Sequence, residues 1–277
     1  MTEVSKVWLI TGSSRGLGHA IAEAALNAGH RVVATARKPE QLQDMIDRYG
    51  KNVITFELDV TSPEEANRSV RAAVDTFGRL DVLVNNAGYG DTAAVEDVTL
   101  EAFKAQIDTN FYGVVYMSKA ALPVMRKQGS GHIFQISSIG GRLASPGLTA
   151  YQSAKWAVGG FSLGLAQEVA PLGIKVTVIE PGGMRTDWAG SSMTIPPISE
   201  PYQQTVGAFA KMLREYTGKE PTDPSKVAKV MLEVADMAAP PLRLLIGTDA
   251  VTYVGAAAKE LVESDARWRS LSESVGF

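Results

Sequence analysis

The chain has 277 residues, of which 45% are hydrophobic, and this is enough apolar material for one large α/β domain. The formal net charge is −3 and the 27 lysines and arginines are scattered, which argues against nucleic-acid binding. With no cysteine and three widely separated histidines, neither disulfides nor a metal site is expected. No apolar run reaches the roughly 20 residues that span a bilayer, and the N-terminal one lacks the features of a signal peptide. We therefore expect a cytoplasmic protein without membrane contact.

Short runs rich in valine and isoleucine alternate with amphipathic stretches along the chain. These runs are continuously apolar, which is typical of strands buried on both faces of a parallel sheet. They cover residues 7–10, 31–35, 53–58, 81–85, 132–137, 174–179 and 242–247. The alternation predicts an α/β fold in which a doubly wound, mostly parallel, seven-stranded sheet has helices on both faces, as in a Rossmann-type three-layer sandwich.

Helix start and stop signals divide the intervening segments. A helix is expected over 17–28, before Gly29. Ser62 is a good cap for a helix that reaches residue 77, and another long helix is expected from Thr99 towards residue 125. We predict that residues 1–277 form a single domain.

Residues 187–224 interrupt this alternation, since they contain five prolines and no strand pattern. A long excursion within a compact domain is often a functional lid. Its apolar side chains favour a lid over an apolar pocket, although a purely structural excursion is the alternative. They include Trp188, Met193, Ile195, Ile198, Tyr202 and Phe209.

A glycine-rich turn joins the first predicted strand to the first helix, in the sequence Thr-Gly-Ser-Ser-Arg-Gly-Leu-Gly over residues 11–18. Glycine permits a tight turn and a close approach of backbone N–H groups to a pyrophosphate. The helix that follows directs its positive end towards the same phosphates. The strand–turn–helix context therefore predicts a nucleotide site.

These residues resemble the T-G-x-x-x-G-x-G signature of the short, single-domain branch of the short-chain dehydrogenase/reductase family. Asp59-Val60 after the third strand resembles the family's adenine-contacting pair, and residues 85–88 resemble its N-N-A-G motif. Pro181, Gly182 and Thr186 resemble the P-G…T segment, in which the threonine holds the nicotinamide carboxamide. The resemblance is close from about residue 4 to residue 190. Together with the charge argument below, it implies cofactor contacts from Gly12, Ser14, Arg15, Gly16, Leu17, Gly18, Arg37, Asp59, Val60, Asn86, Ala87, Gly88, Tyr151, Lys155, Pro181, Gly182 and Thr186.

The end of the second strand predicts which nicotinamide cofactor is preferred. An acid there would bind the ribose hydroxyls of NAD(H), but Ala36 occupies that place and Arg37 follows it. Arg15 in the glycine-rich turn is a second cation that could reach a 2′-phosphate. We predict NADP(H) over NAD(H); two solvated arginines are the alternative.

Tyr151 and Lys155 are four residues apart at the start of a predicted helix, so their side chains share one face. A free phenol has a pKa near 10, and a nearby ammonium favours its ionised form. Tyr151 is therefore the candidate acid and base for a carbonyl and its alcohol. The Tyr-x-x-x-Lys spacing is weak evidence by itself, and its position after a strand and a glycine-rich loop gives it weight.

Ser138 lies thirteen residues before Tyr151 and matches the family's catalytic serine, while Ser137 is the competing candidate. A serine hydroxyl there can donate to the substrate oxygen. Asn110 matches the family asparagine, and the resemblance implies that it holds a water in a proton relay through Lys155. The predicted catalytic set is therefore Asn110, Ser138, Tyr151 and Lys155.

The sequence as a whole predicts an oxidoreductase that transfers hydride between NADP(H) and a ketone, aldehyde or secondary alcohol. Tyr89, Leu143 and Trp188 indicate a bulky apolar substrate. The alternatives are an NADP(H)-binding sensor without turnover and a scaffold protein. Residues 244–250, followed by a helix to about Ser264, resemble the retinol- and hydroxysteroid-dehydrogenase-like members. A homodimer or homotetramer is expected, although this ending departs from that of many tetrameric members.

Overall fold

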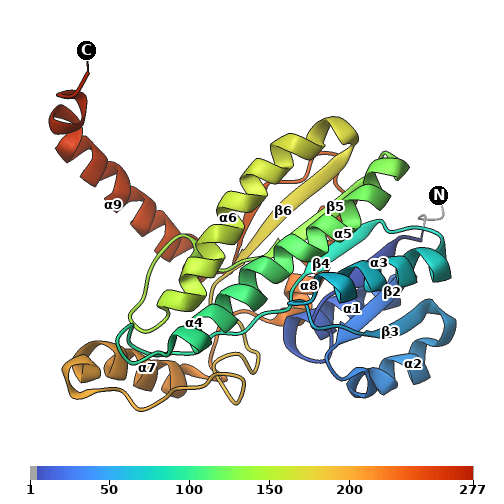
Figure 1. Cartoon of the computed structure of the whole chain (residues 1–277), viewed down its shortest axis with the longest axis horizontal. Coiled ribbons are helices and arrows are strands. Elements are labelled where there is room, and N and C mark those ends of the chain that lie inside the picture. Colours follow the sequence, from blue (N-terminus) through green and yellow to red (C-terminus); the bar gives the residue numbers. More distant parts are fainter. Residues whose placement is uncertain (1–4, 277) are drawn as a thin grey trace.

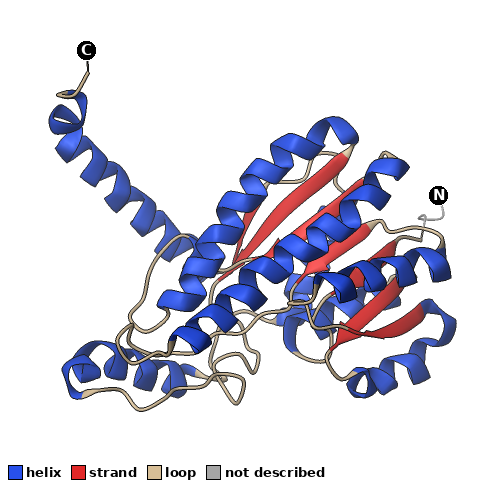
Figure 2. Ribbon diagram, in the orientation of Figure 1, coloured by secondary structure: helices blue, strands red, loops and turns tan. Residues whose placement is uncertain are grey.

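The structure is a computed structural model that describes residues 5–276, and it contains one parallel sheet between two layers of helices (Figures 1 and 2). The sheet has seven strands in the order β3-β2-β1-β4-β5-β6-β7, and every pair is parallel. The strands are β1 (Val7–Ile10), β2 (Arg31–Ala36), β3 (Val53–Glu57), β4 (Val82–Asn85), β5 (Gly131–Ile136), β6 (Ile174–Pro181) and β7 (Arg243–Ile246). Each predicted strand is confirmed to within two residues at either end. The order reverses between β1 and β4, and in open α/β sheets ligands bind in the crevice beside the carboxyl ends of the strands at such a reversal.

Helices cover both faces of the sheet, as predicted. They are α1 (Gly16–Asn27), α2 (Gln43–Tyr49), α3 (Pro63–Phe77), α4 (Leu100–Ile107), α5 (Gly113–Gln128), α6 (Thr149–Val169), α7 (Ala208–Tyr216), α8 (Pro224–Asp236) and α9 (Thr248–Glu273). Side chains of α1, α2 and α8 pack on one face, around Trp8 and Ile10 of β1. Those of α3, α5 and α6 pack on the other, around Val7 and Leu9. Successive residues of a strand point to opposite faces, so one apolar run supplies both cores.

The capping predictions hold, with one informative difference. The Ser62 side chain accepts a hydrogen bond from the backbone N–H of Glu65, and Gly29 follows α1 with a φ of 82°. The long helix expected after Thr99 is instead divided into α4 and α5 by a π-helical turn at Asp108–Tyr112. Such turns often mark functional positions, and this one contains Asn110.

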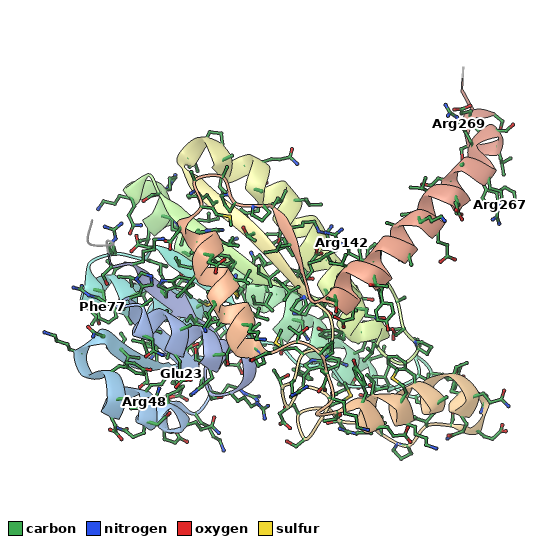
Figure 3. All side chains as sticks on the ribbon, turned by 180° about the vertical axis from the view of Figure 1, so that it is seen from behind. Glu23, Arg48, Phe77, Arg142, Arg267 and Arg269 are labelled. Atoms are coloured by element: carbon green, nitrogen blue, oxygen red, sulfur yellow. The ribbon has the colours of Figure 1, made fainter. Side chains whose placement is uncertain are left out.

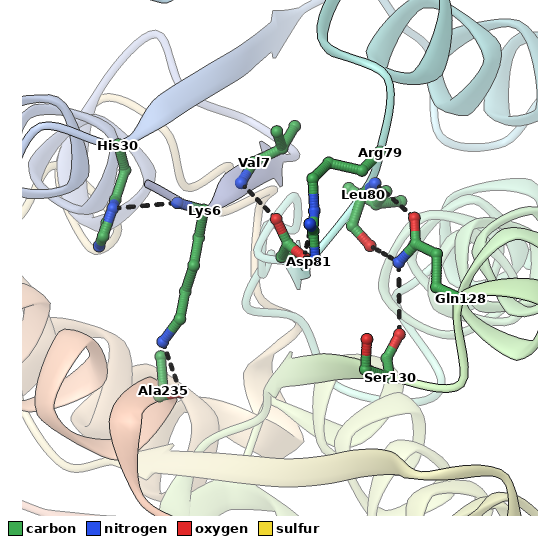
Figure 4. A network of polar contacts seen from close by, with 9 residues as sticks. All are labelled: Lys6, Val7, His30, Arg79, Leu80, Asp81, Gln128, Ser130 and Ala235. Atoms are coloured by element: carbon green, nitrogen blue, oxygen red, sulfur yellow. Dashed lines mark hydrogen bonds and ion pairs between the residues drawn. The ribbon is translucent and has the colours of Figure 1, made fainter. Parts of the chain in front are cut away.

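Polar contacts fix the amino ends of the central strands (Figure 4). The Asp81 carboxylate accepts a hydrogen bond of 2.8 Å from the backbone N–H of Val7. The Gln128 side chain accepts from the N–H of Leu80 and donates to the same residue's carbonyl. These contacts hold β1, β4 and the end of α5 in register, at the edge opposite the crevice.

Two segments extend away from the sandwich. The lid segment, residues 187–224, forms short helical turns and α7 and contains no strand, as expected. Helix α9 projects from the body, with Arg267 and Arg269 on its distal half (Figures 1 and 3). It ends at Glu273 rather than near Ser264, so the predicted length was wrong. The Arg269–Glu273 ion pair supports the additional turns.

Candidate active site

The glycine-rich turn between β1 and α1 is shaped by positions where a side chain would collide with backbone. Gly12 and Gly16 have φ values of 68° and 58°, which disfavour other residues. A Cβ on Gly18 would lie 2.3 Å from the carbonyl oxygen of Gly12. The Asn86 amide donates to the carbonyls of Thr11 and Gly12, at 2.9 and 3.1 Å. The turn is therefore held open at the amino end of α1, a geometry that fits a pyrophosphate.

Beside this turn, β2 ends at the predicted cation. The backbone N–H of Ser13 donates to the Thr35 carbonyl, at 2.8 Å, which places the turn next to the end of β2. Ala36 is buried and Arg37 is exposed. Arg15 is also exposed, and its Nη1 lies 3.4 Å from Oδ2 of Asp187 at the start of the lid segment. A guanidinium thus lies on each of two neighbouring segments beside the crevice, and one of them contacts the lid segment.

The segments after β3 and β4 complete the crevice. The Asp59 carboxylate accepts from the backbone and side chain of Thr61, at 2.9 and 2.8 Å. Val60 is buried against α5, where a Cβ on Gly113 would lie 2.8 Å from its Cγ2. After β4, the Thr11 hydroxyl accepts from the N–H groups of Asn86 and Ala87, each at 2.9 Å. These residues lie at the carboxyl ends of their strands, where ligands bind in open α/β sheets.

Tyr151, Lys155 and Ser138 lie together in the structure. Tyr151 and Lys155 are on one face of α6, both buried, and the Lys155 Nζ lies 5.6 Å from the centre of the phenol ring. That ammonium donates to the Ile136 carbonyl at the end of β5, at 2.8 Å. The Ser138 hydroxyl lies close enough to the Tyr151 phenol to lower its pKa, and it accepts a hydrogen bond of 3.0 Å from the backbone N–H of Gly140. Ser137 points elsewhere, since its hydroxyl donates to the Lys155 carbonyl. The geometry thus separates the two serines that the sequence left open.

Burial dominates the electrostatics of this pair. It raises the pKa of Tyr151 to about 12, and the nearby Ser138 hydroxyl opposes that rise. Burial also lowers the pKa of Lys155 to about 8. The sequence led us to expect that the ammonium would favour the phenolate. In the structure desolvation outweighs that effect, so a phenolate needs further positive charge beside it.

Asn110 in the π-helical turn faces the same centre. Its side-chain amide donates to the carbonyls of Tyr89 and Gln106, each at 2.8 Å. Its Oδ1 is buried and, among the residues described, has no hydrogen-bond partner. A Cβ on Gly88 would lie 2.5 Å from this oxygen and 3.6 Å from the Lys155 Nζ. The free acceptor near an ammonium fits an ordered water between the two groups.

The segment after β6 closes the crevice from the other side. Thr186 lies against the glycine-rich turn, because a Cβ on Gly16 would be 3.6 Å from its side chain. The Asp249 carboxylate of α9 accepts from the N–H of Gly183, at 2.7 Å, and crowds the position of a Cβ on Gly182. Sequence reasoning did not assign a role to Asp249, because it comes from an element far along the chain.

A buried ion triad was also missed by sequence reasoning. Glu180 of β6 is fully buried and pairs with Arg142, which follows Ser138 by four residues, and with Arg243 of β7. Arg142 donates from Nε and Nη2, at 3.0 and 2.5 Å. A charged residue within an apolar strand pattern was the available signal. The triad fixes the Ser138 loop to the β6–β7 side of the sheet.

The lid segment covers the tyrosine with apolar side chains. Trp188 lies over Tyr151, with ring centres 5.1 Å apart, and a Cβ on Gly90 would be 2.7 Å from its indole. Arg214 of α7 donates to three lid carbonyls, including that of Met193 at 2.8 Å. The apolar cluster beneath contains Leu148, Trp188, Ala189, Met193, Ile195, Phe209 and Leu213.

Within residues 5–276, no three histidine, aspartate or glutamate side chains come close enough together to hold a metal ion. Within the same range, the helices are too short or too polar to cross a membrane.

Comparison with known proteins agrees with this architecture. A family described as short chain dehydrogenase matches residues 6–194. Oxidoreductase BOA17 of Botryotinia fuckeliana is 60% identical over 270 residues, which are 97% of this chain and 98% of that protein. A short-chain dehydrogenase from Streptomyces avermitilis superposes with a TM-score of 0.93 at 37% identity, over 99% of this chain and 100% of the other.

More distant solved structures contain the cofactor. A serine dehydrogenase bound to NADP⁺ has a TM-score of 0.75 at 28% identity and covers 87% of this chain and 94% of its own. A 3-ketoacyl-(acyl-carrier-protein) reductase from Brucella melitensis bound to NADH has a TM-score of 0.73 at 25% identity, with 87% and 96% coverage. The sheet, the crevice and these likenesses define an oxidoreductase with a site for a nicotinamide dinucleotide. The chain belongs to the short-chain dehydrogenase/reductase family.

Proposed function

We propose that this protein transfers hydride reversibly between NADP(H) and a ketone, aldehyde or secondary alcohol. The observation that supports it best is the buried pair of Tyr151 and Lys155 on one face of α6, with the Ser138 hydroxyl next to the phenol. A scaffold protein would have no use for a buried phenol and a buried ammonium at the carboxyl edge of the sheet.

Each side chain has a distinct task in this chemistry. A bound nicotinamide supplies or accepts the hydride and, when oxidised, adds the positive charge that the phenolate needs. During reduction the Tyr151 hydroxyl donates its proton to the substrate oxygen, and during oxidation it accepts one. Ser138 donates a hydrogen bond to the same oxygen as its negative charge develops. Lys155 replaces the proton of Tyr151, and Asn110 holds the water that connects Lys155 to solvent.

The cofactor preference rests on charge. Arg37 and Arg15 lie beside the crevice, and Ala36 leaves no carboxylate at the end of β2. Two guanidiniums suit a 2′-phosphate dianion, and an absent carboxylate removes the repulsion that would reject it. The relatives include proteins with either cofactor, so charge is the argument for NADP(H).

The substrate is bulky and apolar. Trp188 and the lid cluster form an apolar cover over Tyr151. Tyr89 lies next to Asn110, because its carbonyl accepts a hydrogen bond from the Asn110 amide. An apolar pocket binds by area and provides few polar groups for orientation.

A homo-oligomer is the proposed state of the enzyme.

A panel of apolar ketones with NADPH and NADH, measured by cofactor absorbance, tests the proposal. Wild type should turn over at least one ketone faster with NADPH. Tyr151→Phe should lose at least about a hundredfold in kcat, the usual size of acid–base catalysis, and still bind NADPH. A protein that binds NADPH but turns over no ketone would be the alternative sensor. A variant that keeps wild-type kcat would overturn the assigned role of Tyr151.

A further inference from the structure

Helix α9 carries an apolar stripe that the body covers only in the first two turns of the helix. Ala250 and Val254 are buried, and the main contacts of the helix with the body are to β7 and to the short helix at Ile139–Gly141. On the same helix face, Leu261 and Trp268 follow at seven-residue intervals from Val254. They are 61% and 57% exposed. The helix extends away from the sandwich over this part (Figures 1 and 3).

We propose that α9 is a dimerisation arm whose stripe packs antiparallel against α9 of a second copy of this chain. A sustained seven-residue apolar repeat is the sequence pattern of paired helices. An isolated helix gains little from its own propensity, whereas packing of an apolar face stabilises it. The face that packs on the body near Val254 continues outward without a partner, so a second molecule is needed to cover it.

Charge favours a protein partner over a lipid surface. Helix α9 carries five acidic and three basic side chains, a net charge of −2. Amphipathic helices that lie on membranes are rich in lysine and arginine along their polar face. A surface of net negative charge would instead be repelled by anionic lipid.

Charge also selects the antiparallel orientation. With Val254, Leu261 and Trp268 at the first core position of the repeat, Glu260 and Arg267 flank the stripe on one side and Asp265 flanks it on the other. An antiparallel pair brings Glu260 beside Arg267 of the second copy, and the symmetry repeats this contact. A parallel pair would bring Glu260 beside Asp265 instead, a repulsion that is also repeated. In the same alignment Asp265 lies beside Ala258 of the second copy, on the other side of the stripe.

Side-chain size agrees with the same alignment. The second core position of the repeat is occupied by Ala257, Ser264 and Leu271. In the alignment that joins Glu260 to Arg267, Trp268 meets Ala257 and Leu261 meets Ser264 of the second copy. Large residues therefore lie opposite small ones, as close packing requires.

Cysteine cross-linking tests the arm directly, because the chain has no cysteine of its own. Ser264→Cys places a thiol on the stripe, and Glu263→Cys places one on the opposite face of the helix. With a short bis-maleimide, Ser264→Cys should give covalent dimers and Glu263→Cys should remain monomeric on a denaturing gel. This result is independent of any other surface that joins subunits. Equal cross-linking of both variants, or of neither, overturns the proposal.

A charge exchange tests the orientation in the Ser264→Cys background. Glu260→Arg should slow cross-linking at least about tenfold, a loss of about 1.4 kcal/mol in association. The double variant Glu260→Arg with Arg267→Glu should restore it. Failure of the double variant to recover overturns the antiparallel pair. Binding of wild type to phosphatidylcholine vesicles, with loss of that binding in Trp268→Ala, would replace the second copy with a lipid surface and overturn the proposal.

Discussion

Burial acts in opposite directions on the titrating side chains of this protein. It raises the pKa of Tyr151 to about 12 and lowers that of Lys155 to about 8, so both groups are shifted towards their neutral forms while Lys155 remains mostly an ammonium at neutral pH. The nearby Ser138 hydroxyl offsets the rise in the Tyr151 pKa only in part. The site is therefore set for an acid, and its conversion to a base depends on charge brought by the cofactor.

The free energy of unfolding should depend on pH through His132. Its ring is buried in β5, hydrogen-bonded to Thr177 and stacked on Phe134, and burial with nearby Lys175 and Lys6 lowers its pKa to about 3. Above the ordinary pKa of 6.5 the imidazole is mostly neutral in the folded and the unfolded chain, so its lowered pKa has little effect on the free energy of unfolding. Below it, the unfolded chain takes up a proton that the folded chain refuses, so stability falls as pH falls towards 3.

Between pH 7 and pH 5, His132 should lower the free energy of unfolding by about 2 kcal/mol. Urea unfolding at both values measures the change. His132→Gln should be less stable at pH 7 but should lose less stability on acidification. A variant with the wild-type loss between the two pH values would assign the acid sensitivity to other groups.

Arg37 should contribute to the preference for NADPH over NADH. Arg37→Ala should lower kcat/KM for NADPH by about 10- to 100-fold, because a hydrogen bond to a charged group contributes about 1.5–3 kcal/mol. The value for NADH should change little. The control is Lys51→Ala, which removes an exposed cation at the opposite end of β3. An equal loss with both cofactors would place Arg37 outside the phosphate site.

At the scale of elements, the catalytic groups are held by contacts between segments that are distant in the chain. The π-helical turn brings Asn110 to α6, and the Asn86 amide fixes the glycine-rich turn from β4. The Glu180 triad joins β6, β7 and the Ser138 loop. Because the carboxylate is wholly buried, the two arginines that pair with it compensate the cost of removing its charge from water.

Glu180→Gln should lower the free energy of unfolding by about 3 kcal/mol, near the low end for a broken buried pair because both arginines can reach water. Chemical denaturation measures the change, and kcat should fall with it as the Ser138 loop loosens. The control is Glu215→Gln, which breaks an exposed pair with Lys211 on α7 and should cost less than about 1 kcal/mol. Similar losses in the two variants would contradict the structural role of the triad.

At the scale of the whole molecule, a rigid sandwich carries a smaller, separately packed lid. The sheet has two continuous cores, whereas the lid cluster is a third that holds a few side chains around Leu148 and Met193. Regions with few buried contacts open most easily. We therefore expect the lid segment to move while the cofactor crevice stays in place.

Arg214→Gln tests this division, because Arg214 bonds the carbonyls of Ala189, Gly190 and Met193. Amide hydrogen exchange over 189–193 should increase, and KM for apolar ketones should rise about tenfold or more, since lid closure contributes to substrate binding. The Kd for NADPH should stay within about twofold. The control is Lys211→Gln on the exposed face of the same helix. Equal effects on ketone and NADPH binding would contradict a separate lid.

Periodicity and turn chemistry were enough to predict the sheet, its parallel strands and the caps at Ser62 and Gly29. They also placed Ser138 at the end of β5 and placed Tyr151 and Lys155 at the start of α6. The structure brings these three residues together. They did not predict the π-helical turn, because α and π turns share one apolar pattern. The last turns of α9 were also missed, although Trp268 and Leu271 continue the apolar repeat there.

The sequence by itself determined the fold, since local hydrophobic patterns and glycine positions act through short-range sterics and burial. It also determined the residue types of the site, because the chemistry of a phenol and an amine is fixed by composition. Only the tertiary structure decided which serine faces Tyr151, that Asp249 and Glu180 support the site, and that desolvation outweighs the ammonium's pull on the phenol. These depend on distances between segments far apart in the chain, and pairwise electrostatics and burial act through such distances.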